Sequence, residues 1–225
     1  SPDATFDTVT NIAKQNPDIN FNLFRQNKNI GAEKNIIFLL KQTQCEYVMY
    51  LCDDDTLMKL YISKVIKYLS KDSGVGCIIP GIVSHRSDGS SCEFRSRKFD
   101  EAIYSPGFES CLELSKYGHQ LTGLVLKSKD LYNRYTRNRE LGNLYPSIFY
   151  VCYCSLNYKT VYLPGYKVRV LSGNVKDWSY DASSLLTEVF KNYFALFDDV
   201  NKIHSLEMDF IYSNMNRLRI RSEEH

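Results

Sequence analysis

A short apolar run that ends in three consecutive carboxylates, Asp53, Asp54 and Asp55, constrains this 225-residue chain more than any other feature. The run covers residues 46–52 and is dense in tyrosine and other strand-forming residues. Because helical patterns flank it on both sides, it predicts a buried strand in an α/β protein. Three acids at the exit of a buried strand repel one another, which costs stability unless positive charge lies among them.

Two interpretations of this acidic triplet are open. A divalent cation bridging to a substrate phosphate would neutralise it, because hard cations take oxygen ligands and often keep phosphate in their coordination shell. Alternatively, the triplet is a solvated acidic turn that caps a helix. Its position favours the cation, because ligands in open α/β sheets bind beyond the carboxyl ends of the strands.

A second pattern lies upstream, where Asn29 and Gly31 connect a predicted strand over residues 21–24 to a predicted helix over residues 32–43. Asn and Gly tolerate the tight backbone that such a turn needs. The first turn of the helix presents free N–H groups, and Lys34 adds a positive charge there. The pattern predicts an anion site, although an ordinary structural turn contains the same residue types.

Together the two patterns resemble the family 2 glycosyltransferases of GT-A fold. Asn29, Gly31 and Asn35 match the family's Asn-Gly-Asn pattern, and Asp53 to Asp55 match its acidic DXD motif. Within the family, the chain looks most like the sugar transferases of bacterial surface-polysaccharide assembly, such as abequosyltransferase- and rhamnosyltransferase-like proteins.

The resemblance implies an α/β fold with a Rossmann-like, mostly parallel sheet flanked by helices. It covers residues 1–181, which are expected to form the glycosyltransferase domain. Family members begin with a strand, a helix and a second strand, whereas residues 1–5 look like the end of that segment. The domain is therefore expected to be N-terminally incomplete, with a C-terminal helical extension over residues 182–225.

The resemblance also implies a reaction in which a sugar leaves a nucleotide-sugar donor for a glycan or lipid-linked acceptor, with inversion at the anomeric carbon. Mn²⁺ or Mg²⁺ would neutralise charge on the departing diphosphate. Asp55 is expected to bind the metal directly, and Asp53 to reach the metal through water or to bind the ribose. Asp54 points away if the chain is extended here, and it is assigned to donor binding with the rest of the triplet.

An inverting transfer needs a carboxylate base that deprotonates the acceptor hydroxyl. Family members carry this base just before the helix that is predicted here from Tyr145. Glu140 is the only acid between Asp130 and Asp177, so Glu140 is the candidate base and Asp177 is the next to consider. A solvated loop acid is the other interpretation of Glu140.

Residues downstream of the acidic triplet complete the expected site. Arg169 is a candidate for phosphate contact, and Trp178 either stacks on a sugar face or packs in the core. Thr122 and Gly123 are small enough to let a sugar approach closely. The predicted donor-binding residues are Asn29, Gly31, Lys34, Asn35, Asp53, Asp54, Arg169 and Trp178.

Composition limits the class of protein. A formal net charge of +2 without a long basic stripe argues against a nucleic-acid partner. Seven scattered cysteines without a CxxC pair favour a reduced, cytoplasmic environment. No apolar run approaches the roughly 20 residues of a membrane span.

Three classes of function stay open. A metal-dependent inverting glycosyltransferase is favoured. A nucleotidyltransferase or similar metal-dependent nucleotide enzyme also uses clustered acids beneath phosphates, but the chain lacks its Gly-rich phosphate loop. The third class is a non-catalytic remnant of a glycosyltransferase.

The C-terminal part has apolar and aromatic residues at helical spacing over residues 185–197 and 203–220. These helices are expected to cover the sheet or to pair with another subunit in a homo-oligomer. A second interpretation is peripheral contact with the inner face of the cell membrane, because Arg217, Arg219 and Arg221 accompany the apolar residues. That contact would bring the site to a lipid-linked acceptor.

Overall fold

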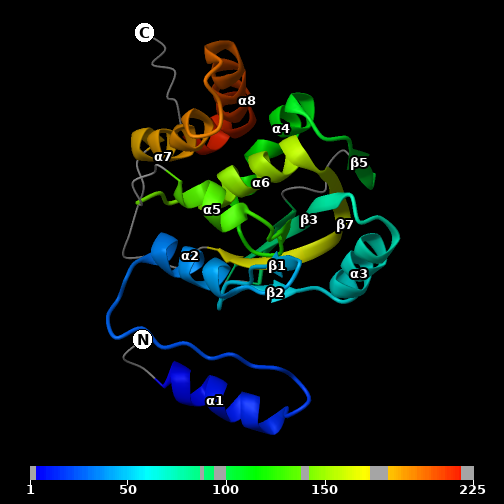
Figure 1. Ribbon diagram of the computed structural model, residues 1–225, viewed down its shortest axis with the longest axis vertical. Coiled ribbons are helices and arrows are strands. Elements are labelled where there is room, and N and C mark those ends of the chain that lie inside the picture. Colours follow the sequence, from blue (N-terminus) through cyan, green and yellow to red (C-terminus); the bar gives the residue numbers. More distant parts are fainter. Residues whose placement is uncertain (1–3, 87–88, 94–99, 138–141, 173–181, 219–225) are drawn as a thin grey trace.

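The computed structural model shows a curled sheet with helices on both faces (Figure 1). Helices α5 and α6 cover one face, α7 and α8 form a further layer beyond α6, and α3 covers the other face. The structure describes residues 4–86, 89–93, 100–137, 142–172 and 182–218.

The helices are α1 (Thr5–Gln15), α2 (Ala32–Gln42), α3 (Tyr61–Lys71), α4 (Phe108–Leu114), the 3₁₀ helix η1 (Ser115–His119), α5 (Leu131–Thr136), α6 (Pro146–Asn157), α7 (Ala182–Phe194) and α8 (Val200–Leu218). The strands are β1 (Tyr47–Met49), β2 (Thr56–Leu57), β3 (Val75–Arg86), β4 (Ser91–Glu93), β5 (Ala102–Tyr104), β6 (Val125–Lys127) and β7 (Lys159–Ser172).

The sheet has the order β1-β6-β3-β7-β2, with β4 beside β3 and β5 beside β7. Within the described strands, β3 and β7 pair in parallel and the other five pairings are antiparallel. The predicted α/β class is confirmed, and the sheet is mixed, with more antiparallel pairing than expected. The long crossover from β3 to β7 permits a parallel pair, whereas only four residues separate β3 from β4, which is too few for anything but an antiparallel pair.

Most sequence-predicted elements are present, and one is wrong. The helix expected over residues 32–43 is α2, and the strand expected at residues 46–52 is shortened to β1. The strand expected over residues 21–24 does not form, and Phe21, Leu23 and Phe24 are exposed there. A strand needs a hydrogen-bonded neighbour, and this segment pairs with no strand in the described part of the chain.

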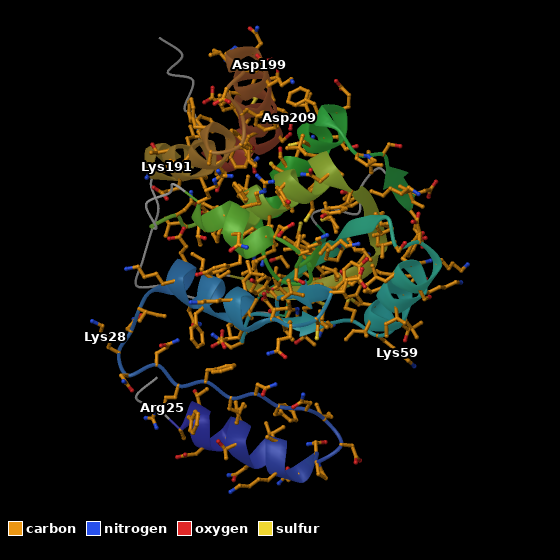
Figure 2. All side chains as sticks on the ribbon, viewed as in Figure 1. Arg25, Lys28, Lys59, Lys191, Asp199 and Asp209 are labelled. Carbon is orange, nitrogen blue, oxygen red and sulfur yellow. The ribbon has the colours of Figure 1, made fainter. Side chains whose placement is uncertain are left out.

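Helix α1 lies apart from the sheet in Figure 1 and has no buried residue. It contacts the segment that follows it, where the Arg25 guanidinium lies 5.4 Å from the centre of the Phe6 ring. Figure 2 shows Arg25 and Lys28 on this segment, below the main body. The helix and the segment line a groove of about 550 Å³.

The sheet is buried on both faces, which explains the apolar character of its strands. On one face, Ile79, Leu124 and Leu126 pack against Phe149 and Tyr150 of α6. On the other face, α3 packs against β3 and β7. The buried residues there are Tyr61, Val65, Val75, Ile78, Ile82, Val125, Val161, Leu163, Val168 and Val170.

The C-terminal helices use their apolar residues inside the domain. Tyr193 of α7 and Phe210 of α8 are fully buried with Ile148 and Cys152 of α6. The Lys116 ammonium lies 3.2 Å from an Asp209 carboxylate oxygen, which ties η1 to α8. These helices therefore cover the α6 layer rather than the sheet itself. None of the helices described is long and apolar enough to cross a membrane.

The packing of α7 and α8 predicts that two Phe→Ala substitutions differ in their effect on the free energy of unfolding. Phe210→Ala removes a fully buried ring and should lower the free energy of unfolding by about 3–5 kcal/mol. Phe194→Ala removes a ring that is 61% exposed and should change it by less than about 0.5 kcal/mol. Urea denaturation measures both, and equal small effects would show that α8 does not share the core.

Candidate functional site

The acidic triplet lies in the turn between β1 and β2. Asp53 and Asp54 are exposed, whereas Asp55 is half-buried. The backbone N–H of Asp55 donates to the Cys52 carbonyl at 3.2 Å, which closes the turn. The triplet therefore follows a strand as predicted, but β1 is half-buried at the end of the sheet order rather than a buried strand. Its three members differ in exposure and in hydrogen bonding.

Asp55 is held by two segments that are distant in sequence. The Thr122 hydroxyl donates to Oδ2 of Asp55, and the Leu171 backbone N–H donates to Oδ1 at 3.3 Å. Each carboxylate oxygen has two acceptor positions, so one oxygen can accept more than one donor. Asp55 thus has a fixed orientation, which suits it to direct coordination.

The electrostatic field of the triplet is visible at its neighbour. Burial raises the pKa of the Cys52 thiol above its ordinary value, the Thr122 hydrogen bond opposes this, and the charges of the three aspartates raise the pKa further. The thiolate form of Cys52 is therefore disfavoured beside the aspartates. The same negative potential attracts a cation.

Strand pairing brings Arg169 to this turn. Thr56, directly after the triplet, lies opposite Arg169 in the β2–β7 pairing. Arg169 is exposed between the buried Val168 and Val170, as expected for alternation along a strand. Its cationic side chain thus stands on the solvent side of the strand next to the acidic turn.

The Asn-Gly turn has the backbone that the sequence predicts. Gly31 has a φ of 83°, and its N–H donates to the Asn29 side-chain oxygen at 2.8 Å. Lys34 and Asn35 are exposed in the first turn of α2. The Tyr50 hydroxyl donates to the Ile36 carbonyl at 3.4 Å, so α2 also contacts the segment that leads into the triplet.

Glu33 is a functional candidate that the sequence patterns did not indicate. This acid is 6% exposed, and its two oxygens accept hydrogen bonds from the Tyr135 hydroxyl and the Gly142 N–H. Glu33 thus joins the start of α2 to residues on both sides of the candidate base. The signal was an acid on the apolar face of α2, four residues before the buried Ile37.

Three predicted residues, Glu140, Asp177 and Trp178, lie outside the described residues. Gly123 is described, and the structure gives it a packing role. Its φ is 80°, and an added Cβ would collide with the Val168 side chain and lie 3.0 Å from Pro80 Cγ. Packing against β3 and β7 therefore requires this glycine.

Oxygen donors dominate the turn. In the part of the chain that the structure describes, no group of three His, Cys, Asp or Glu side chains gathers closely enough to enclose a metal ion. The carboxylate of Asp55, alone or together with that of Asp53, is available to the metal instead. Mg²⁺ usually binds in this way, with water and substrate phosphates completing its shell. The residues present therefore fit a metal that binds together with a phosphorylated ligand.

Comparison with known proteins identifies the family. The family model described as glycosyl transferase family 2 matches residues 1–159, and the chain belongs to this family. No curated protein sequence matches the chain. The match includes both the Asn-Gly turn and the acidic triplet.

Solved structures support the GT-A fold. Staphylococcus aureus TarS 1-349 superposes with a TM-score of 0.66 at 14% identity, covering 98% of this chain and 64% of that one. The same protein in complex with UDP-GlcNAc gives a TM-score of 0.68 at 14% identity, covering 100% and 66%. GalNAc-T7 with UDP, GalNAc and Mn²⁺ gives 0.51 at 12% identity, covering 95% and 47%. The chain thus spans less than two thirds of the length of these structures.

The two positive-φ glycines near the site predict unequal responses to alanine. Gly31→Ala has open space for its Cβ and should cost about 1–2 kcal/mol of backbone strain. Gly123→Ala adds overpacking against Val168 and Pro80, and should cost about 2–5 kcal/mol in total. Thermal or urea unfolding measures the difference, and equal losses would contradict the packing role of Gly123.

Proposed function

We propose that this protein is a metal-dependent, inverting glycosyltransferase that uses a nucleotide-sugar donor. The observation that carries the proposal is the Asp55 carboxylate, fixed at a strand end by Thr122 and Leu171 beside the exposed Asp53. Membership of glycosyl transferase family 2 supports this reaction class. The structural neighbours captured with UDP-GlcNAc, and with UDP and Mn²⁺, support a UDP-linked donor and a divalent metal.

In this proposal, Asp55 ligates Mn²⁺ or Mg²⁺ directly, and Asp53 assists it through water or binds the ribose. The metal supplies positive charge against the diphosphate leaving group. Asp54 and the Asn29–Gly31 turn contribute to the donor pocket, as do Lys34 and Asn35. Arg169 adds a cation on the β7 side of the turn.

The chain's own residues must also move a proton. We assign the general base to Glu140, with Asp177 as the alternative, because an inverting attack requires a carboxylate that takes the proton of the acceptor hydroxyl. The Glu33 contact with Gly142 supports this assignment, since it anchors the segment directly after Glu140 to α2. Trp178 would then stack on a sugar ring.

We propose as acceptor a glycan or lipid-linked sugar of surface-polysaccharide synthesis, reached from the cytoplasmic side. In the described part of α8, the exposed Val200, Tyr212 and Met215 are apolar groups that a peripheral membrane contact would use. A nucleotidyltransferase is the weaker alternative, because the family match concerns sugar transfer.

The metal assignment predicts the effect of Asp55→Ala. Outer-shell partners of metal ligands are typically worth 10- to 100-fold in affinity, so loss of a direct ligand should weaken Mn²⁺-dependent UDP binding by more than about 100-fold. Isothermal titration calorimetry with UDP, performed once in Mn²⁺ and once in EDTA, measures this affinity. The control is Glu109→Ala, which removes an exposed acid from α4.

Wild-type affinity in Asp55→Ala would remove the acidic triplet from the site. Equal UDP binding in Mn²⁺ and in EDTA would remove the metal. If the wild-type chain binds no nucleotide from a panel of UDP, GDP, CDP and dTDP, the non-catalytic interpretation gains support.

The base assignment predicts a different pattern. Glu140→Gln should cut sugar transfer by about 100-fold or more, because that is the usual contribution of a general base. Donor affinity should stay unchanged, because the residue acts on the acceptor. The transfer rate with the nucleotide-sugar donor that the panel identifies is compared with the calorimetric Kd for that donor, which separates catalysis from donor binding. A nearly unchanged transfer rate would move the assignment to Asp177.

A further inference from the structure

We propose that Thr122 is a positioning residue that orients the Asp55 carboxylate for the metal and the nucleotide diphosphate. The inference rests on the proposed function and extends it to a residue outside the acidic triplet. Thr122 lies 67 positions beyond Asp55 in the sequence and directly precedes the packing glycine, Gly123. It binds neither metal nor nucleotide in this proposal and acts through Asp55.

The direction of the Thr122 hydrogen bonds follows from its partners. The Cys52 backbone N–H donates to Thr122 Oγ1 at 3.1 Å, so this contact uses a lone pair of the hydroxyl. The hydroxyl proton is then directed to Oδ2 of Asp55, which can only accept when ionised. Thr122 thus connects the first and the last residue of the turn that presents the triplet.

Thr122 itself has little freedom to move. Its side chain is fully buried, and a β-branched residue has few χ1 options. The neighbouring Gly123 N–H donates to the Tyr50 carbonyl at 2.8 Å, and the Gly123 carbonyl accepts from the buried Tyr61 hydroxyl at 2.5 Å. The hydroxyl that holds Asp55 is therefore attached to the rigid core between the sheet and α3.

The orientation of Asp55 depends on such contacts. The χ2 torsion of an aspartate has a broad energy profile, so a solvated carboxylate samples many orientations. Here Thr122 fixes one oxygen and the Leu171 N–H fixes the other. A ligand held within a narrow range of orientation binds with less loss of freedom, which is the physical advantage of a preorganised site.

A purely structural role is the alternative, in which Thr122 only closes the turn through Cys52. Two substitutions test these roles when UDP affinity is compared with stability. Thr122→Val keeps the branched shape and loses both the donor to Asp55 and the acceptor of the Cys52 N–H, whereas Thr122→Ser keeps the hydroxyl and loses a methyl group. The matched control is Thr160→Val, which removes an equally buried hydroxyl that lies 3.0 Å from the Ser155 hydroxyl. Thr160 lies near the start of β7, whereas Leu171, which contacts Asp55, lies near its end.

The experiment is calorimetric titration of the full chain with UDP, in Mn²⁺ and in EDTA, beside apo melting temperatures. Thr122→Val should weaken Mn²⁺-dependent UDP binding by about 10- to 100-fold, the range for an outer-shell partner of a metal ligand. Thr122→Ser should restore affinity to within about threefold, since one hydroxyl donor is regained. Thr160→Val should lower the melting temperature and leave UDP affinity unchanged.

The outcomes distinguish this inference from the function on which it rests. If wild-type protein shows no Mn²⁺-dependent UDP binding, or Asp55→Ala does not weaken it, the proposed function fails and the inference fails with it. If Asp55→Ala abolishes that binding while Thr122→Val retains it, only the positioning role is overturned. Should Thr122→Val not fold, Thr122→Cys offers a similar size with a weak donor, and wild-type affinity in that variant would also overturn the positioning role.

Discussion

The parallel pairing of β3 with β7 is the constraint on which the rest of the structure depends. It extends from Val75 opposite Lys159 to Arg86 opposite Ser172, and both cores are built on its faces. The register of the pair shifts between Pro80 and Gly81, where a side chain in place of Gly81 would collide with the Pro164 carbonyl. Because β7 also pairs with β2, the same strand delivers Leu171 and Arg169 to the acidic turn.

The site is therefore coupled to the core rather than placed on a free loop. Tyr50 links α2 to the segment that leads into the acidic turn, and the Tyr50 carbonyl accepts the Gly123 N–H. Tyr61 of α3 reaches the Gly123 carbonyl from the other face of the sheet. Substitutions in this small network should affect stability and donor affinity together, which is why matched controls of equal burial are needed to separate them.

Glu33 illustrates a second coupling, between α2 and the segment that follows the candidate base. Burying a carboxylate is costly unless its oxygens are hydrogen-bonded, and here both accept a donor. The cost explains why such a residue is rare in a core. Its two bonds bring the Asn-Gly turn and Gly142 into one connected unit, although more than a hundred residues separate them in the chain.

The sequence by itself determined the α/β class, the order of most helices and strands, the Asn-Gly turn and the short strand that precedes Asp53 to Asp55, because these depend on local periodicity and backbone preference. It failed for residues 21–24, since strand formation needs a paired neighbour. Only the tertiary structure decided that the sheet is mixed, that Thr122 and Leu171 hold Asp55, and that Glu33 is buried. Those contacts join residues far apart in the chain, and no local pattern records which distant groups the packed core brings together.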